Sequence, residues 1–218
     1  MKSAVIIGAT GLIGGHLLKD LLDDPQYEKV TVLTRKSVGF SEPKLEVKMG
    51  EASSLAQTGS IAAQDFFCCL GTTRKAAGSE SAFRKIDYDA VLEFGRLAER
   101  SGAERLVVVT ALGADVSSRV FYNRVKGEVE RALSKIKIPT VIIFRPSLLM
   151  GQRKESRPLE HVASIVLNKL PIYVGKLKKY APIEGSTVAK AMQIQARKKM
   201  PLGFLILESD QISECAKG

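Results

Sequence analysis

Apolar residues recur along this chain in two rhythms, short runs typical of buried strands and longer stretches at helical spacing. Residues 4–7 form the first run, glycines follow it, and leucines and isoleucines then recur three and four residues apart. This pattern predicts a strand, a tight turn and a helix. Similar runs predict further strands at residues 29–34, 45–49, 66–70, 105–109, 140–144 and 203–207.

Helical periodicity separates most of these runs. It predicts helices at about residues 81–101, 118–136, 159–170 and 186–199, whereas the polar tail after Glu208 is expected to be frayed. Strands that alternate with helices argue for a parallel sheet covered on both faces. The sequence therefore predicts an α/β fold with a doubly wound parallel sheet, in a single domain over residues 1–218.

The glycine-rich turn after the first strand carries the clearest chemistry. Gly8 lets the chain turn sharply, Gly11 leaves no side chain between the backbone and a ligand, and Gly14 lets the helix pack closely. The exposed N–H groups at the start of the helix favour an anion, most simply the pyrophosphate of a dinucleotide. The residues assigned to this contact are Gly8, Thr10, Gly11, Leu12, Ile13 and Gly14.

The second predicted strand is followed by Arg35 and Lys36. In a dinucleotide-binding fold this position lies beside the adenosine ribose, where an acidic residue favours NAD and an arginine pairs with the 2′-phosphate of NADP. Arg35 and Lys36 therefore predict NADP(H) as the cofactor. The alternative is a strand-end arginine that only faces solvent.

A second small polar turn follows the fourth predicted strand. Leu70, Gly71, Thr72 and Thr73 lie at the carboxyl end of that strand, where ligands bind in open α/β sheets. These residues are predicted to contact the cofactor, with Thr72 facing its central part.

Tyr122 and Lys126 lie four residues apart in a predicted helix, so they share one of its faces. An ammonium group near a phenol favours the phenolate, and such a tyrosine can pass a proton to or from a carbonyl oxygen as a hydride is transferred. The spacing alone is common on surfaces. Its place after a dinucleotide-type turn and the fifth strand favours a catalytic pair.

Composition and charge narrow the classes of protein to which this chain can belong. The chain has 218 residues, 45% of them hydrophobic, and no apolar run approaches the ~18 residues of a membrane span. Residues 3–7 are too short for the apolar core of a secretory signal, so a cytoplasmic protein is expected. The net charge of +10 comes from scattered basic residues, which favours a solvated surface or a polyanionic cofactor over specific nucleic-acid binding.

The cysteines predict neither a metal site nor a disulfide. Cys68, Cys69 and Cys215 have no metal-ligand spacing and leave an odd count. Cys68 and Cys69 lie in an apolar run, so we expect reduced thiols on opposite faces of a buried strand.

Together these motifs resemble the atypical division of the short-chain dehydrogenase/reductase superfamily, and within it the Tat-interactive-protein-like subgroup of small NADPH-binding proteins. The resemblance covers essentially the whole chain and rests on residues 8–14, 69–73, 112–115, 122–128 and 144–153. It implies a Rossmann core with strand order 3-2-1-4-5-6-7, a short C-terminal substrate region, cofactor contacts from Arg145 and Pro146, and oxidoreductase activity. It also implies a homodimer through the helices that follow strands four and five, with a protein partner as the alternative.

One position departs from the superfamily pattern. Members that reduce carbonyls place Ser or Thr after the fifth strand to bind the substrate oxygen, and Ala111 stands there in this chain. Thr110 takes this role if the loop is shifted, although in an extended strand it would point the other way. No asparagine can be matched to the fourth member of the superfamily's catalytic set, so Tyr122 and Lys126 alternatively only hold the nicotinamide ribose.

Two functions are therefore left open by the sequence. The first is an NADP(H)-dependent oxidoreductase that reduces a small carbonyl-type substrate, with Tyr122, Lys126 and Thr110 as catalytic residues. The second is a non-catalytic NADPH-binding module that senses redox state or binds a protein partner. The resemblance places Arg153, Arg157 and Glu160 around the substrate region, where they would suit an acidic substrate, with surface ion pairing as the alternative. His161 lies near the same region and is expected to have a structural role.

Overall fold

The central sheet has seven parallel strands in the order β3-β2-β1-β4-β5-β6-β9, which is the order expected from the family resemblance. The computed structural model describes residues 1–51, 54, 59–151, 175–198 and 202–218. The strands are β1 (Lys2–Ile7), β2 (Tyr27–Thr34), β3 (Leu45–Met49), β4 (Asp65–Cys68), β5 (Arg105–Val109), β6 (Thr140–Arg145) and β9 (Gly203–Glu208).

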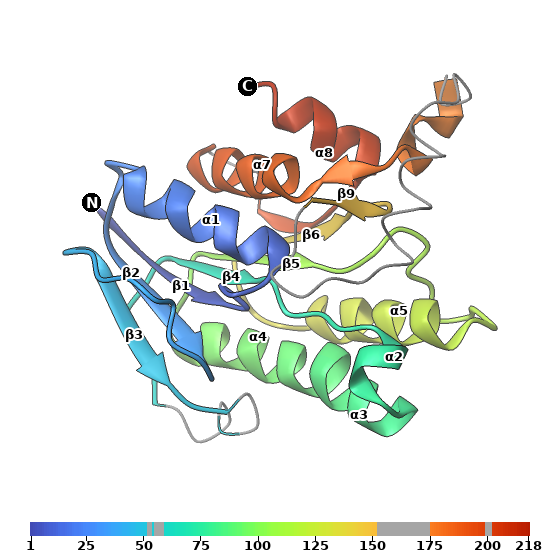
Figure 1. Cartoon of the computed structure of the whole chain (residues 1–218), viewed down its shortest axis with the longest axis horizontal. Helices are drawn as coiled ribbons and strands as arrows, with labels where there is room; N and C mark the ends of the chain where they lie inside the picture. Colours follow the sequence, from blue (N-terminus) through green and yellow to red (C-terminus); the bar gives the residue numbers. More distant parts are fainter. Residues whose placement is uncertain (52–53, 55–58, 152–174, 199–201) are drawn as a thin grey trace.

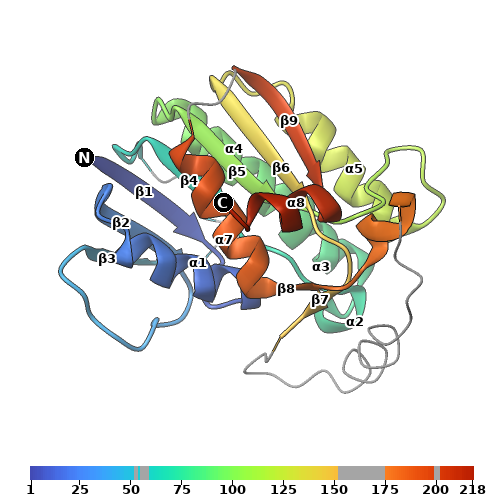
Figure 2. The ribbon, with the colours of Figure 1, turned by 90° about the horizontal axis from the view of Figure 1, so that it is seen from above.

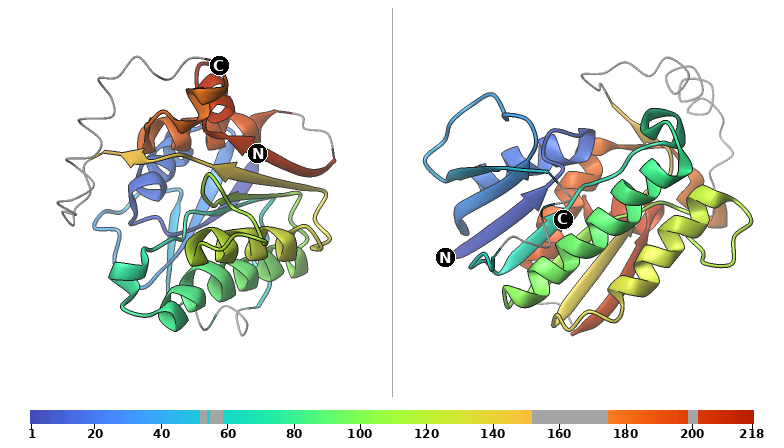
Figure 3. Two further views of the ribbon diagram at one scale, coloured as in Figure 1. Left: turned by 90° about the vertical axis from the view of Figure 1, so that its right-hand side faces the viewer. Right: turned by 90° about the horizontal axis from the view of Figure 1, so that it is seen from below.

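Helices cover both faces of this sheet (Figure 1). The helices α1 (Leu12–Asp23), α7 (Gly185–Arg197) and α8 (Ser209–Cys215) lie on the upper face in Figure 1 and in front of the strands in Figure 2. The helices α4 (Val91–Arg100) and α5 (Phe121–Leu133) lie side by side on the opposite face (Figure 3, right). The predicted doubly wound α/β fold is thereby confirmed.

Alternating side chains of each strand supply two separate hydrophobic cores. Ile6 and Phe67 pack in the core that α1 and α7 cover, whereas Val5 and Phe66 pack in the core that α4 and α5 cover. All four side chains are fully buried. This follows from the period of two along a strand, which sends successive residues to opposite faces.

Cys68 and Cys69 obey the same rule, as predicted. Both are free thiols, Cys68 in the core beneath α4 and Cys69 packed against the core beneath α1. Burial raises the pKa of the Cys68 thiol to about 12, so this group stays protonated at neutral pH.

The helix expected at residues 81–101 is divided into three parts. They are α3 (Glu80–Arg84), a π-helical turn η2 (Lys85–Ala90) and α4, and a short helix α2 (Arg74–Ala77) precedes them. Two side-chain caps fix the starts of α2 and α3, because Thr73 accepts from the N–H of Ala76 and Ser79 from the N–H of Ala82. The wider turn of η2 shifts the phase of the helix at Asp87, a residue of the candidate site described below.

The prediction of a frayed tail after Glu208 is wrong. Residues Ser209–Cys215 form α8, whose Ile212 is fully buried against α7 and the sheet. The backbone N–H of Glu208 donates to the side-chain oxygen of Gln211 at 2.8 Å, which fixes the first turn. The tail has too few apolar residues for helical periodicity to be visible in the sequence.

A short parallel pair of strands was also not predicted. β7 (Leu149–Met150) pairs with β8 (Ile183–Glu184) apart from the main sheet, and the turn η3 (Gly175–Tyr180) precedes β8. The helix expected at residues 159–170, together with Arg153, Arg157, Glu160 and His161, lies outside the described residues. Within the part of the chain that is described, no helix has the length and apolarity needed to cross a membrane.

Candidate functional site

The glycine turn between β1 and α1 combines a backbone conformation and a close packing that residues with a side chain could not adopt. Gly8 has φ +82°, and a Cβ there would lie 2.6 Å from the carbonyl group of Cys69. The N–H of Gly11 donates to the carbonyl oxygen of Gly8 at 3.0 Å, and a Cβ on Gly14 would overlap that same oxygen. Two of the glycines thus allow β1, β4 and the first turn of α1 to meet closely.

The first turn of α1 is electrostatically open to an anion. Its N-cap is Gly11, which has no side chain to occupy the free N–H groups, and its first turn contains no acidic residue. Thr10 is exposed beside it, and Ile13 is buried. The side chain of Leu12 turns away toward the segment after β7 and the start of α7, where a Cβ on Gly151 or Gly185 would collide with it.

Arg35 lies directly after β2, at the carboxyl edge of the sheet, as the sequence indicated. Its side chain is 63% exposed, and its guanidinium lies 3.9 Å from the carboxylate of Glu51. Lys36 continues the turn, and both its N–H and its carbonyl are bonded to the hydroxyl of Thr34. A guanidinium held this loosely can be drawn to a stronger anion than an exposed carboxylate.

The turn after β4 is tied to the helical layer beneath it. The backbone N–H of Thr72 donates to Oδ2 of Asp87 at 3.0 Å, and Asp87 is fully buried in η2. Thr73 caps α2 and Leu70 packs against the core beneath α4. Gly71 lies between them, where an added Cβ would be 3.7 Å from Asp87 and 3.8 Å from the Lys126 ammonium.

Tyr122 and Lys126 do meet on one face of α5, beside this turn. The Lys126 ammonium lies 6.0 Å from the centroid of the Tyr122 ring and 2.7 Å from Oδ1 of Asp87. The ring of Tyr122 packs against that of Phe83 with centroids 5.5 Å apart, which fixes its orientation from α3. The arrangement brings together a phenol, an ammonium and a carboxylate from two helices.

Lys126 is buried, yet its environment keeps it charged. Burial alone would lower the pKa of this ammonium, but the Asp87 carboxylate, together with Tyr122 and Cys68, raises the pKa above the ordinary lysine value. The charge is therefore present at neutral pH but largely compensated by Asp87. The phenol of Tyr122 consequently faces an ion pair, and not the isolated positive charge that the sequence suggested.

Asp87 is the residue that sequence reasoning missed. It occupies a core position between Phe83 and Val91 at intervals of four residues, so a carboxylate stands where an apolar side chain is expected. This mismatch between residue type and position was the available signal. The π-helical turn, a feature frequent at functional sites, turns it toward α5 and the β4 turn.

Thr110 and Arg145, two further predicted site residues, both bind the carboxylate of Glu130. Thr110 is 6% exposed, and its hydroxyl donates to Oε1 of Glu130 at 2.6 Å. Arg145 holds the same carboxylate through two nitrogens, at 3.0 and 2.5 Å. In this geometry the Thr110 hydroxyl is not free to bind a substrate oxygen, and the predicted role would require it to leave Glu130.

Pro146 also takes a structural part in this region. Its carbonyl oxygen accepts the N–H of Leu112 at 2.9 Å, which ties the turn after β5 to the end of β6. Ala111 lies in that turn and provides no side-chain donor.

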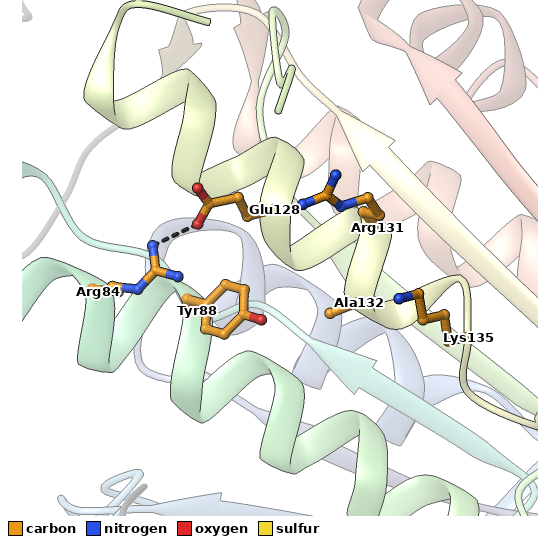
Figure 4. A pocket seen from close by; sticks show the side chains of 6 residues that line it. All are labelled: Arg84, Tyr88, Glu128, Arg131, Ala132 and Lys135. Carbon is orange, nitrogen blue, oxygen red and sulfur yellow. Dashed lines mark hydrogen bonds and ion pairs between the residues drawn. The ribbon is translucent and has the colours of Figure 1, made fainter. Parts of the chain in front are cut away.

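Two hollows lie beside α5, and one of them reaches the predicted site residue Arg145. One, of about 360 Å³, lies between η2 and α5, and Figure 4 shows Arg84 reaching Glu128 across it above the ring of Tyr88. The other, of about 320 Å³, lies between α5 and the edge of the sheet at Arg145 and Phe204. Neither is lined by Tyr122, Lys126 or the glycine turn.

The sheet order, the glycine turn and the Tyr122–Lys126 pair define an atypical short-chain dehydrogenase/reductase. Solved structures agree on the fold. UDP-galactose 4-epimerase superposes with a TM-score of 0.71 at 16% identity, covering 94% of this chain and 76% of its own. MoeE5 in complex with UDP-glucose and NAD superposes with a TM-score of 0.68 at 16% identity, covering 99% of this chain and 81% of its own.

The sequence comparisons show the family. The model of the HIM1 family matches residues 40–177, and this chain belongs to that family. Relatives include the protein fmp52, mitochondrial, of Emericella nidulans, 33% identical over 88% of this chain and 85% of the relative. HTATIP2 of Rattus norvegicus is 37% identical over 78% and 72%. These names agree with the resemblance to the Tat-interactive-protein-like subgroup.

The expectation of a cytoplasmic protein is wrong on this comparison. Fmp52 relatives from Emericella nidulans, Scheffersomyces stipitis and Candida albicans are all named mitochondrial. The sequence argument considered only a secretory signal and a membrane span, whereas mitochondrial targeting uses amphipathic, arginine-rich segments. The absence of an apolar run therefore had no bearing on that compartment.

Proposed function

We propose that this chain is an oxidoreductase that binds NADP(H) and transfers a hydride between it and a small carbonyl-type substrate. The observation that carries the proposal is the Tyr122–Lys126 pair, buried in part beside the β4 turn and on the same edge of the sheet as the glycine turn. Ligands of open α/β sheets bind at that edge. The MoeE5 and WbmG structures with the same fold hold NAD, which supports a nicotinamide dinucleotide here.

The residues of this chain fit such a cofactor. The uncapped first turn of α1 offers N–H groups to a pyrophosphate, and Gly8 and Gly14 let β1, β4 and this turn pack closely at the carboxyl edge of the sheet. The exposed guanidinium of Arg35 supports the choice of NADP over NAD, since a planar fork of donors suits a 2′-phosphate. A nicotinamide bound in this way supplies or accepts the hydride.

In this proposal the side chains of α5 handle the proton. Tyr122 donates its hydroxyl proton to the carbonyl oxygen during reduction and takes it back during oxidation. Lys126 holds the nicotinamide ribose with the N–H groups that Asp87 does not use. Phe83 keeps the phenol ring in place from the side of α3.

The first experiment is a fluorescence titration with NADPH and NADH, followed by cofactor oxidation against a panel of small carbonyl compounds. We expect NADPH to bind more tightly than NADH and to be oxidised by at least one compound. In the Tyr122→Phe variant turnover should fall by about 10²–10⁴-fold, while NADPH affinity stays within a few-fold of wild type. Unchanged turnover in this variant would remove Tyr122 from the reaction.

A second candidate function is supported by the turn after β5. Ala111 provides no hydroxyl, and that of Thr110 is held by Glu130, so the usual donor to a substrate oxygen is missing from this geometry. A chain that binds NADPH but reduces nothing would act as a redox-sensing or partner-binding module. NADPH that binds tightly and stays reduced across the carbonyl panel would favour this function.

We also propose a homodimer through α4 and α5, the two long helices on the lower face in Figure 1. The hollow between η2 and α5 lies on this layer, lined by Arg84, Tyr88 and Glu128 among others. Sedimentation velocity of the purified protein tests it. A monomer across the micromolar range would leave a protein partner as the occupant of this layer.

A further inference from the structure

A single buried carboxylate connects two elements of the candidate site. Asp87 is fully buried, and each of its oxygens faces a different part of the chain. Oδ2 accepts the backbone N–H of Thr72 at 3.0 Å, and Oδ1 lies 2.7 Å from the Lys126 ammonium. The β4 turn and α5 are thus held by the same side chain of η2.

The approach of Lys126 to Asp87 is an ion pair without an aligned hydrogen bond. Among the described residues no donor is aligned with Oδ1, although the ammonium is close to it. An ammonium has three donors, so it can be fixed by Asp87 and still donate to another group.

Stability alone is a weak reason for this pair. Apolar side chains of similar volume often replace a buried ion pair at no cost in stability. The other buried residues of α3 and η2 are apolar, namely Phe83 and Ala90. A charged pair at this edge of the sheet, beside the residues proposed to hold the cofactor, therefore points to a role in the site.

We propose that Asp87 is a positioning residue, which fixes the Lys126 ammonium and the Thr72 backbone from one carboxylate. The inference rests on the proposed function only where it concerns the cofactor.

The groups around Lys126 determine how its charge would respond to the loss of the Asp87 carboxylate. Asp87 faces the ammonium from η2, Tyr122 from α5 and Cys68 from β4. Cys68 is a neutral thiol at pH 7, because burial raises its pKa to about 12. Without the Asp87 carboxylate the burial of Lys126 remains, and burial lowers the pKa of an ammonium. The lysine should then lose its proton closer to neutral pH.

The test begins with the protein free of cofactor. Lysine side chains labelled with ¹³C are titrated by NMR, and the Lys126 signal is the one missing from a Lys126→Met variant. In wild type we expect Lys126 to stay protonated as far as the fold persists at alkaline pH. In Asp87→Asn the midpoint should fall by at least about one pH unit relative to an ordinary lysine. Equal midpoints in the two proteins would overturn the proposal.

The matched control is Asp89→Asn, the same chemical change two residues away. Asp89 is exposed in the same π-helical turn. Its loss should leave the midpoint of Lys126 unchanged. A shift as large as that of Asp87→Asn would mean that overall charge, and not the pairing, sets the state of Lys126.

Cofactor binding gives the second readout. NADPH affinity of Asp87→Asn should weaken by about tenfold one pH unit above the Lys126 midpoint that NMR gives for this variant, whereas wild type and Asp89→Asn should change little over the same range. If wild type binds no dinucleotide, the proposed function fails while the NMR titration still decides the role of Asp87. If wild type binds and Asp87→Asn shows the same pH dependence, the positioning role fails alone.

A folding defect in Asp87→Asn can be separated from loss of positioning. The double variant Asp87→Asn, Lys126→Met removes both charges, so it should melt at a higher temperature than Asp87→Asn alone. A double variant that is no more stable than the single one would show that the two groups are not coupled.

Discussion

Two buried aspartates lie at opposite edges of the sheet, and their surroundings differ. Asp65 begins β4 at the amino edge, where Oδ1 meets Arg105 at 2.5 Å and Oδ2 meets the Tyr27 hydroxyl at 2.7 Å and Lys2 at 3.3 Å. Asp87 lies near the carboxyl edge with one ion pair and one backbone donor. The Asp65 carboxylate at the amino edge accepts from three side chains. The Asp87 carboxylate at the carboxyl edge pairs with one lysine, whose ammonium has N–H donors left for another group.

This difference matches a division of labour in the fold. Arg105 also donates to the carbonyl oxygens of Ala196 and Lys198, so the amino edge ties β4 and β5 to the end of α7. At the carboxyl edge the turns rely on glycines and backbone contacts. We infer that the first network serves stability and the second serves binding, and three substitutions sharpen that contrast.

The largest effect is expected at the amino edge. Asp65→Ala leaves Arg105 buried without its carboxylate and removes the acceptor of the Tyr27 hydroxyl, so the free energy of unfolding should fall by about 3–5 kcal/mol. Urea denaturation measures it. The exposed pair of Arg96 and Glu93 provides the control, since Glu93→Gln should cost less than about 0.5 kcal/mol. A loss below about 1 kcal/mol in Asp65→Ala would contradict a structural role.

A smaller effect on stability, with a clear effect on binding, is expected at Gly8. Gly8→Ala would place a Cβ 2.6 Å from Cys69 at a φ of +82°. Gly39→Ala is the matched control, because Gly39 has φ +83° but nothing within 4 Å of an added Cβ. We expect a loss of about 1–2 kcal/mol in the control and more in Gly8→Ala. Isothermal calorimetry should show NADPH binding lost only in Gly8→Ala, and equal behaviour of the two variants would contradict the close approach.

The smallest effect concerns pH and Asp24, which follows α1 at the amino edge. Burial would raise the pKa of Asp24, but the Arg197 guanidinium at 2.6 Å, with Gln26 and Gln193, lowers it below its usual value. Its contribution to stability is therefore complete above the ordinary aspartate pKa of about 3.9 and is lost as pH falls through the lowered value.

Asp24→Asn should accordingly cost about 1 kcal/mol at pH 7 and progressively less below pH 4. Thermal melts from pH 2 to pH 7 measure the difference between the two proteins. Wild-type and variant curves that stay parallel throughout this range would show that Asp24 does not stabilise the fold through its charge.

The sequence predicts the sheet well because its signals are local. Buried strands such as β1 and β5 are continuous apolar runs bounded by turns, and their order follows from a recognisable family pattern. The wrong parts, such as α8, are those whose structure depends on contacts made elsewhere. Ile212 packs against a helix and a sheet that its own segment does not reveal.

The candidate site divides in the same way. Gly8 and the spacing of Tyr122 and Lys126 are visible because each depends on a few neighbouring residues. Asp87 and the engagement of Thr110 by Glu130 depend on how α5 packs against η2 and β5. Pairs that lie 39 and 20 residues apart have no signature in a single sequence.

The packing of Leu12 also bears on how the chain is made. A side chain at Gly151 or Gly185 would collide with Leu12, so the first turn of α1 reaches its final packing only against residues far along the chain. During synthesis the glycine turn emerges early, yet its surroundings are incomplete until α7 has left the ribosome. The N-terminal strand, turn and helix therefore do not form an independent unit that could be moved to another protein. A fragment that ends before residue 185 should leave the Leu12 side chain uncovered.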